Sequence, residues 1–123
     1  MSKKPAIVDN YPALDRAFRL EESVPINKAL MRMFGPGQAL LIQFLYTSYK
    51  QREMEALCIY STTIADQTGL TCREVEKYRS MCEKIGLFTS DLMSRRLMLR
   101  EYHLDYPALL DLYRQHKEKE ALA

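Results

Sequence analysis

The sequence lacks the motifs by which most enzymes can be recognised. It has no glycine loop of the phosphate-binding kind, no His-Glu-x-x-His pair and only two histidines, His103 and His116. Neither histidine has a neighbour in the sequence that resembles an activated nucleophile. We therefore expect a protein that is not an enzyme and that requires no cofactor.

Cysteine is also scarce, with Cys58, Cys72 and Cys82 as the only three. Their number is odd, no pair has the Cys-x-x-Cys spacing, and the two histidines add no common metal-binding pattern. Free cysteine usually behaves as a small hydrophobic residue. We therefore expect structural or incidental cysteines and no bound metal.

Long apolar runs are missing as well. The run Ala-Leu-Leu-Ile-Gln-Phe-Leu-Tyr at 39–46 is too short to cross a membrane. Lys3 and Lys4 are not followed by an apolar block of signal-peptide length. These two lysines fit either a solubilising terminus or a basic arm that reaches along DNA. We expect a cytoplasmic protein without a membrane partner.

Charge of one sign is not in large excess, because 18 basic residues face 16 acidic ones and the net charge is +2. A nucleic-acid-binding protein with this balance must cluster its basic residues locally, since phosphate neutralisation supplies much of the affinity. The balance leaves room for a protein partner. A length of 123 residues and a hydrophobic content of 47% fit one globular domain.

The segment from Thr62 to Gly86 has the pattern of a helix-turn-helix. A short helix over 62–67 is broken by Gly69, and Thr71 is well placed to cap a second, longer helix. The apolar positions of the second helix recur at helical steps and predict its buried face. They are Val75, Tyr78, Cys82 and Ile85. A serine hydroxyl at position 82 is expected to lack a partner on that face.

The opposite face of the second helix is predicted to be polar. It carries Arg73, Glu76, Lys77, Ser80 and Lys84. A recognition helix presents its first residues to the major groove, where arginine can pair with guanine. The candidate DNA-contacting residues of this helix are Thr71, Cys72, Arg73, Glu76, Lys77 and Ser80. The alternative is an ordinary solvated face, and the glutamates at 74 and 76 argue against a purely phosphate-driven interaction.

Arg79 lies on the flank of the predicted buried face, and we expect it to pair with Glu83 four residues later in a structural role.

The rest of the chain predicts further helices and strands around this motif. Before the motif we expect an arm over 1–10, a short helix from Asp9 or Asn10 with Leu14, Phe18 and Leu20 on one edge, and a connector over 21–26. Next come a helix capped by Asn27 with Ala29, Leu30 and Met33 inward, a stop at 35–37, and a buried helix over 38–51 whose apolar residues are Leu40, Leu41, Phe44, Leu45 and Tyr49. The expected strands cover 57–60, 87–89 and 96–102, and a last helix covers 107–120.

Residues 90–95 are expected to form the tip of the hairpin that joins the last two strands. Arg95 and Arg96 then suit contact with phosphates or insertion into the minor groove. The alternative is that these charges keep the hairpin soluble and protect an edge strand. The predicted fold is mainly α with a small antiparallel β-hairpin. It is a winged helix-turn-helix with additional N- and C-terminal helices, formed by residues 11–120 between the arm and a tail at 121–123.

Five stretches of the chain resemble the winged-helix domains of phage and plasmid replication-initiation proteins of the replisome-organiser type. They are Val-Pro-Ile-Asn-Lys-Ala-Leu at 24–30, Phe-Gly-Pro-Gly-Gln-Ala-Leu-Leu-Ile-Gln-Phe-Leu-Tyr at 34–46, Ile-Ala-Asp-Gln-Thr-Gly-Leu-Thr-Cys-Arg-Glu-Val at 64–75, Lys-Ile-Gly-Leu-Phe at 84–88 and Tyr-His-Leu-Asp-Tyr-Pro-Ala-Leu-Leu at 102–110. The resemblance implies a winged-helix fold and binding to double-stranded DNA. It implies no recruitment of a helicase loader, since the large C-terminal domain that does this has no counterpart here.

Two functions are compatible with these patterns. The first is DNA binding in replication initiation or transcriptional regulation of a phage or mobile element, with two copies on a two-fold site. The leucines of 107–120 are a candidate self-association surface, or else pack onto the core of the same subunit. The second function is that of a protein-binding winged-helix adaptor or inhibitor, acting on a host or replication protein.

Overall fold

Most helices and strands of the computed structural model begin and end at residues that favour such a boundary in the sequence. The structure describes residues 26–53 and 56–122. In chain order the elements are α2 (Lys28–Phe34), α3 (Pro36–Gln51), β1 (Leu57–Tyr60), α4 (Ser61–Thr68), α5 (Cys72–Lys84), β2 (Phe88–Ser94), β3 (Leu99–Leu104) and α6 (Tyr106–Leu122). The described residues are therefore mostly helical, with five helices and a small three-stranded antiparallel sheet. The predicted arm, first short helix and most of the connector lie outside the described residues.

Two short signals organise the start of the described chain. The Asn27 side chain accepts hydrogen bonds from the backbone N–H groups of Ala29, at 2.8 Å, and Leu30, at 3.1 Å, so the predicted N-cap is confirmed. Gly35 ends α2 with φ at 82°, a conformation that favours glycine, and Pro36 opens α3 at once. The predicted stop at 35–37 is thus a corner between two helices.

Helix α3 supplies the centre of the core. Leu41, Ile42 and Leu45 are completely buried and Tyr49 nearly so. The prediction placed Leu40 and Phe44 on the apolar face of this helix, but these two residues are only partly buried. It did not include Ile42, which is completely buried. The buried stripe is turned toward Ile42 because α3 is surrounded by α4, α5 and β3 as well as α2.

The sheet has the order β1-β3-β2, with both pairings antiparallel. The predicted strand over 57–60 is confirmed, but the hairpin is longer than predicted. Strand β2 continues to Ser94, and the turn is formed by residues 95–98 instead of 90–95. A bulge between Leu92 and Ser94 and a positive φ of 52° at Met98 close this turn.

The helix-turn-helix segment forms as two helices around a left-handed Gly69. The Thr71 cap of α5 is confirmed, and Val75 and Cys82 are fully buried. Tyr78 is partly buried against Gly37 of α3, where an added Cβ would meet the ring at 2.4 Å. The prediction for Ile85 is wrong, because α5 ends at Lys84 and this side chain is 50% exposed.

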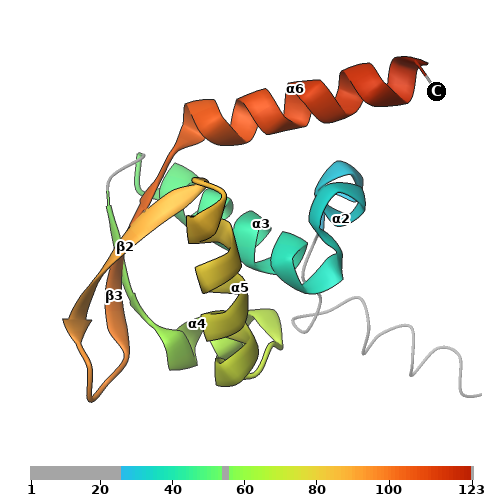
Figure 1. Ribbon diagram of the computed structural model, residues 1–123. Coiled ribbons are helices and arrows are strands. Elements are labelled where there is room, and N and C mark those ends of the chain that lie inside the picture. The colour runs from blue at the N-terminus through green and yellow to red at the C-terminus, as the bar shows by residue number, and fades with distance from the viewer. Residues whose placement is uncertain (1–25, 54–55, 123) are drawn as a thin grey trace, which may run out of the picture.

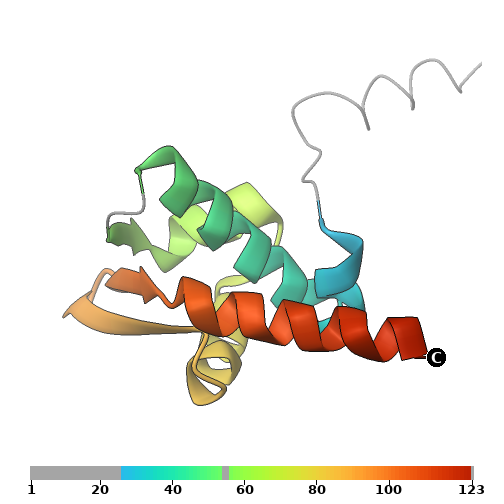
Figure 2. The same cartoon turned by 90° about the horizontal axis from the view of Figure 1, so that it is seen from above.

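Helix α6 crosses the molecule at the end opposite the β2–β3 turn (Figures 1 and 2). It begins at Tyr106 and continues to Leu122, slightly beyond the predicted 107–120. No residue of α6 is fully buried, although Leu109 and Leu112 pack against the core. An ion pair of 2.9 Å between Arg32 of α2 and Glu120 fastens its last turns.

Candidate nucleic-acid interface

The start of α5 is fixed by a reciprocal pair of hydrogen bonds. The Glu74 N–H donates to the Thr71 hydroxyl at 3.1 Å, and the Thr71 N–H donates to the Glu74 carboxylate at 3.0 Å. This capping box gives both side chains a structural role. It also leaves the first turn of α5, including the exposed Cys72 and Arg73, at the surface.

Three basic side chains lie on the outer face of α5. Arg73, Lys77 and Lys84 are exposed, and none forms an ion pair with a described residue. The Lys77 ammonium lies 5.7 Å from the centre of the Tyr78 ring, within the range of a cation–π contact. Ser80, also a predicted contact residue, is only partly exposed.

Glu76, predicted to lie on the outer face, turns inward instead. Its carboxylate accepts a hydrogen bond from the Ser61 hydroxyl at 2.8 Å and lies 3.3 Å from Arg79 and 3.7 Å from Arg100. The inward orientation follows from these two guanidinium groups, whose side chains are largely buried and need a negative partner. Glu76, one of the predicted DNA-contacting residues, is thus engaged within the fold.

Glu83 is engaged in the same way. It pairs with Arg79, as predicted, and it accepts hydrogen bonds from the Ser90 N–H at 2.9 Å and the Ser90 hydroxyl at 3.0 Å. Arg100 also donates to the Ser90 hydroxyl at 3.2 Å. These contacts fix the angle between α5 and the β2–β3 hairpin.

Sequence reasoning missed Arg100, Ser61 and Ser90 as members of this polar cluster. A signal existed for Arg100, because the two-residue period of a strand places it on the same face as Tyr102, which is fully buried. Burial raises the pKa of Tyr102, and the nearby Glu76 carboxylate raises it further, so the hydroxyl stays neutral.

The charge of the outer face of α5 follows from these contacts. All three glutamates of the helix are held by partners within the fold, namely Glu74 by the cap, Glu76 by the arginines and Glu83 by Arg79 and Ser90. The exposed charges that remain without a described partner are all positive. A nearly neutral chain thus has a locally basic helix face.

The β2–β3 turn presents a second pair of basic groups. Arg95 and Arg96 are both exposed, and neither forms an ion pair with a described residue. The turn and the first turn of α5 lie at the same end of the molecule (Figure 1). The structure therefore places Arg95 and Arg96 at the same end as Arg73 in the first turn of α5, whereas Lys84 lies at the other end of this helix.

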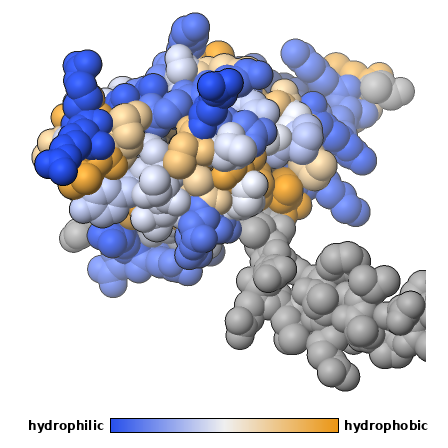
Figure 3. Space-filling model, turned by 90° about the horizontal axis from the view of Figure 1, so that it is seen from below, coloured by the Kyte–Doolittle hydropathy of each residue, from blue (hydrophilic) through white to orange (hydrophobic). Residues whose placement is uncertain are grey.

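Apolar side chains accompany the arginines of this turn. Leu92, Met93 and Leu97 are 39%, 56% and 53% exposed. Figure 3 views this end of the molecule and shows hydrophobic and hydrophilic residues mixed at the left, where the hairpin lies in Figure 1. The hairpin surface is thus amphipathic.

A cluster of acidic residues and one histidine lies on the outside of the sheet and was not predicted. His103 Nε2 lies 3.0 Å from a Glu101 carboxylate oxygen and 3.7 Å from an oxygen of Asp91, which pairs with Glu101 across the strands. These are the only His, Cys, Asp and Glu groups in the described part of the chain whose arrangement could hold a metal ion. Of the cysteines, Cys58 and Cys72 are exposed and Cys82 is buried.

Comparison with known proteins gives no match, since no family model, curated protein or solved structure is significantly similar to the chain. Within residues 26–53 and 56–122, no helix is long and apolar enough to cross a membrane.

Proposed function

We propose that this protein binds double-stranded DNA, with α5 in the major groove and the β2–β3 turn against the flanking backbone. The observation that carries the proposal is the exposed surface of α5, where Arg73, Lys77 and Lys84 stand without a carboxylate partner among the described residues. Phosphate neutralisation depends on local positive charge rather than on the net charge of the chain.

The topology supports a winged-helix arrangement for this role. A short strand precedes α4 and α5, a hairpin follows them, and β1 pairs with the far strand of that hairpin. In such an arrangement the second helix enters the groove and the hairpin reaches the backbone or the minor groove. Helix α5 has 13 residues, about 20 Å of helix, which suits a groove roughly 12 Å wide.

The set of residues that we assign to DNA contact differs from the set that the sequence alone indicated, because Lys84 is added and Thr71 and Glu76 are left out. The assigned residues are Arg73, Lys77 and Lys84 on α5, with Cys72 beside them, and Arg95 and Arg96 on the turn. We assign structural roles to Thr71 and Glu76. Thr71 caps α5, and Glu76 forms ion pairs with Arg79 and Arg100. Ser80 also stays a candidate for DNA contact, although its side chain is less exposed than those of Arg73 and Lys77.

The resemblance to replisome-organiser domains extends the proposal to its context. We infer a cytoplasmic role in replication initiation or transcriptional regulation of a phage or other mobile element. A single recognition helix reads only a few base pairs, so we expect two copies of the chain on a two-fold DNA site.

The helix assignment is tested by fluorescence titration of labelled duplexes with Arg73→Ala and Lys77→Ala. Loss of a base contact is expected to weaken binding by about 1–3 kcal/mol and to relax the preference at one base pair. Lys119→Ala, at an exposed position of α6, removes the same charge far from α5 and is the matched control. Unchanged affinity in both α5 variants would remove the assignment.

A second function is supported by the exposed apolar residues of the hairpin. Leu92, Met93 and Leu97 suit a protein partner better than they suit phosphates. In that case the protein is an adaptor or inhibitor of a host or replication protein. A double variant Leu92→Ser/Met93→Ser that loses a stoichiometric, salt-insensitive protein complex but retains DNA binding would assign this role to the hairpin.

A further inference from the structure

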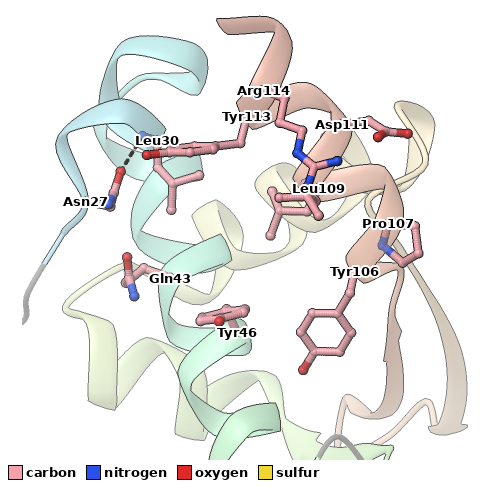
Figure 4. Close-up of a pocket in the computed structure, with 11 residues that line it drawn as sticks. Asn27, Leu30, Gln43, Tyr46, Tyr106, Pro107, Leu109, Asp111, Tyr113 and Arg114 are labelled. Carbon is pink, nitrogen blue, oxygen red and sulfur yellow. Dashed lines mark hydrogen bonds between the residues drawn. The ribbon is translucent and has the colours of Figure 1, made fainter. Parts of the chain in front are cut away.

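A hollow of about 660 Å³ lies between α6 on one side and α2 and α3 on the other (Figure 4). Its walls are mainly apolar and aromatic, and its rim is polar. Among the lining residues are Asn27, Tyr46, Tyr106, Leu110, Asp111 and Arg114. The volume matches that of sites that enclose a ligand or a few side chains of a peptide.

The hollow stays open because α6 is fastened near its two ends. At the first turn the Tyr106 ring packs edge-on against Tyr46, with 5.8 Å between ring centres. Near the last turns Glu120 accepts the 2.9 Å ion pair from Arg32. Between these points Leu110 is 45% exposed and no residue of α6 is fully buried. The face of α6 that carries Leu110 therefore lacks a partner within the described part of the chain.

The chain itself provides a segment of suitable chemistry close to this hollow. The 25 residues that precede Ile26 lead directly to Asn27, which is one of the residues lining the hollow. Within them, Leu14 and Phe18 are four positions apart in the sequence Tyr-Pro-Ala-Leu-Asp-Arg-Ala-Phe-Arg-Leu at 11–20, the spacing of two side chains that share one face of a helix. The five residues at 21–25 can span up to about 17 Å.

Charge is complementary as well. The rim of the hollow carries Asp111 and Arg114, while the segment carries Asp15, Arg16 and Arg19 between its apolar positions. A helix whose apolar side chains enter a groove and whose charged ones meet the rim is a common mode of peptide recognition.

We propose that residues 11–20 of the same chain occupy the hollow between α2, α3 and α6, with Leu14 and Phe18 against its apolar walls. The short connection to Asn27 makes this docking intramolecular, so the effective concentration of the segment is on the order of millimolar. A second copy of the chain has no such advantage at low concentration. The docked segment then completes the packing of α6.

Photocrosslinking of the full chain tests the occupant. Benzoylphenylalanine replaces the half-exposed Leu110, and at a control position it replaces Met93 on the distant hairpin. We expect position 110 to crosslink within one chain to residues 11–20, and position 93 to give no such product. A crosslinked dimer from position 110 would assign the hollow to a second copy, and the absence of any crosslink to 11–20 would also overturn the proposal.

Hydrogen exchange of α6 gives an independent measurement. In Leu14→Asp/Phe18→Asp the amides of 109–114 should exchange about tenfold faster, equivalent to loss of about 1.4 kcal/mol of docking energy. The control Lys3→Ala/Lys4→Ala removes two charges outside residues 11–20 and should exchange nearly as the wild type does. Equal exchange in all three proteins would contradict intramolecular docking.

Discussion

At the scale of single residues, Cys82 is the clearest case of a side chain defined by its surroundings. It is completely buried, and its sulfur accepts a 3.5 Å hydrogen bond from the Gln38 side chain. The buried Gln38 amide beside this position is a potential partner for a hydroxyl that the sequence expectation did not take into account. Gln38 could not be identified as a neighbour of Cys82 from the sequence, because it lies on α3, 44 residues earlier in the chain.

Burial raises the pKa of Cys82 to about 12, with the Gln38 hydrogen bond opposing the shift. The thiol is thus neutral throughout the ordinary pH range and poorly nucleophilic. In a thiol-modification experiment at pH 8 we expect the exposed Cys58 and Cys72 to react and Cys82 to remain unmodified until denaturant is added. Three equally fast thiols would show that α5 does not pack as described.

Glu76 gives a second prediction at this scale, because it holds Arg79 and Arg100 in a largely buried cluster. Glu76→Ala leaves both guanidinium groups without this carboxylate. We expect the free energy of unfolding to fall by about 1–3 kcal/mol in urea denaturation. Lys77→Ala, one position away on the exposed face, should change it by no more than about 0.5 kcal/mol. Equal stability of the two variants would place Glu76 on the surface after all.

At the scale of elements, the caps could be predicted from the sequence and the polar cluster could not. Asn27 and Thr71 hold backbone groups within three residues of themselves, so the local sequence is enough. The orientation of Glu76 depends on Arg100, which a strand brings beside α5 only when the sheet forms. The hairpin turn was misplaced for a similar reason, since the bulge near Leu92 depends on pairing with β3.

The contact between α3 and α5 yields a prediction about Gly37. A Cβ at this position would lie 2.4 Å from the Tyr78 ring, so Gly37→Ala must displace the ring. Overpacking of this kind costs about 1–3 kcal/mol of stability. The same substitution in a Tyr78→Ala background should cost much less, which a double-mutant cycle in urea measures. Additive effects would mean that the two helices do not approach so closely.

The end of α6 is expected to respond to acid. Desolvation raises the pKa of Glu120, but His116, Arg32 and Lys117 outweigh it and hold this pKa below its usual value of 4.5. A carboxylate with a depressed pKa stabilises the fold above the unfolded value, and this contribution is lost as the pH falls through the folded pKa. Below about pH 4.5 we therefore expect α6 to loosen from α2.

Amide chemical shifts of α6 followed through this pH range measure the loosening. Glu120→Gln cannot form the ion pair with Arg32 at any pH, so its α6 shifts should lose this dependence on pH. A transition that persists in Glu120→Gln would assign the acid response to another group.

At the scale of the whole molecule, the proposed DNA binding requires a nearly neutral protein to have a locally basic surface on α5 and the β2–β3 turn. The net charge of +2 does not reveal this surface. The glutamates of α5 form contacts within the fold, whereas Arg73, Lys77 and Lys84 form no ion pair with a described residue. Composition alone could not separate these two groups of charges. The topology of strands and helices, in contrast, was largely readable from periodicity, because each element packs one apolar face against a common core.

The salt dependence of DNA binding tests this central claim most directly. The logarithm of the affinity is measured against the logarithm of salt concentration for the wild type, for Arg95→Ala/Arg96→Ala and for a control, Lys50→Ala/Lys119→Ala, which removes two exposed charges outside α5 and the turn. We expect Arg95→Ala/Arg96→Ala to bind all sequences more weakly. Its slope should be flatter by about 1.8, which corresponds to two phosphate contacts, and the control should keep the wild-type slope. Equal slopes for all three proteins, or a wild type that does not bind duplex DNA at low salt, would contradict this claim.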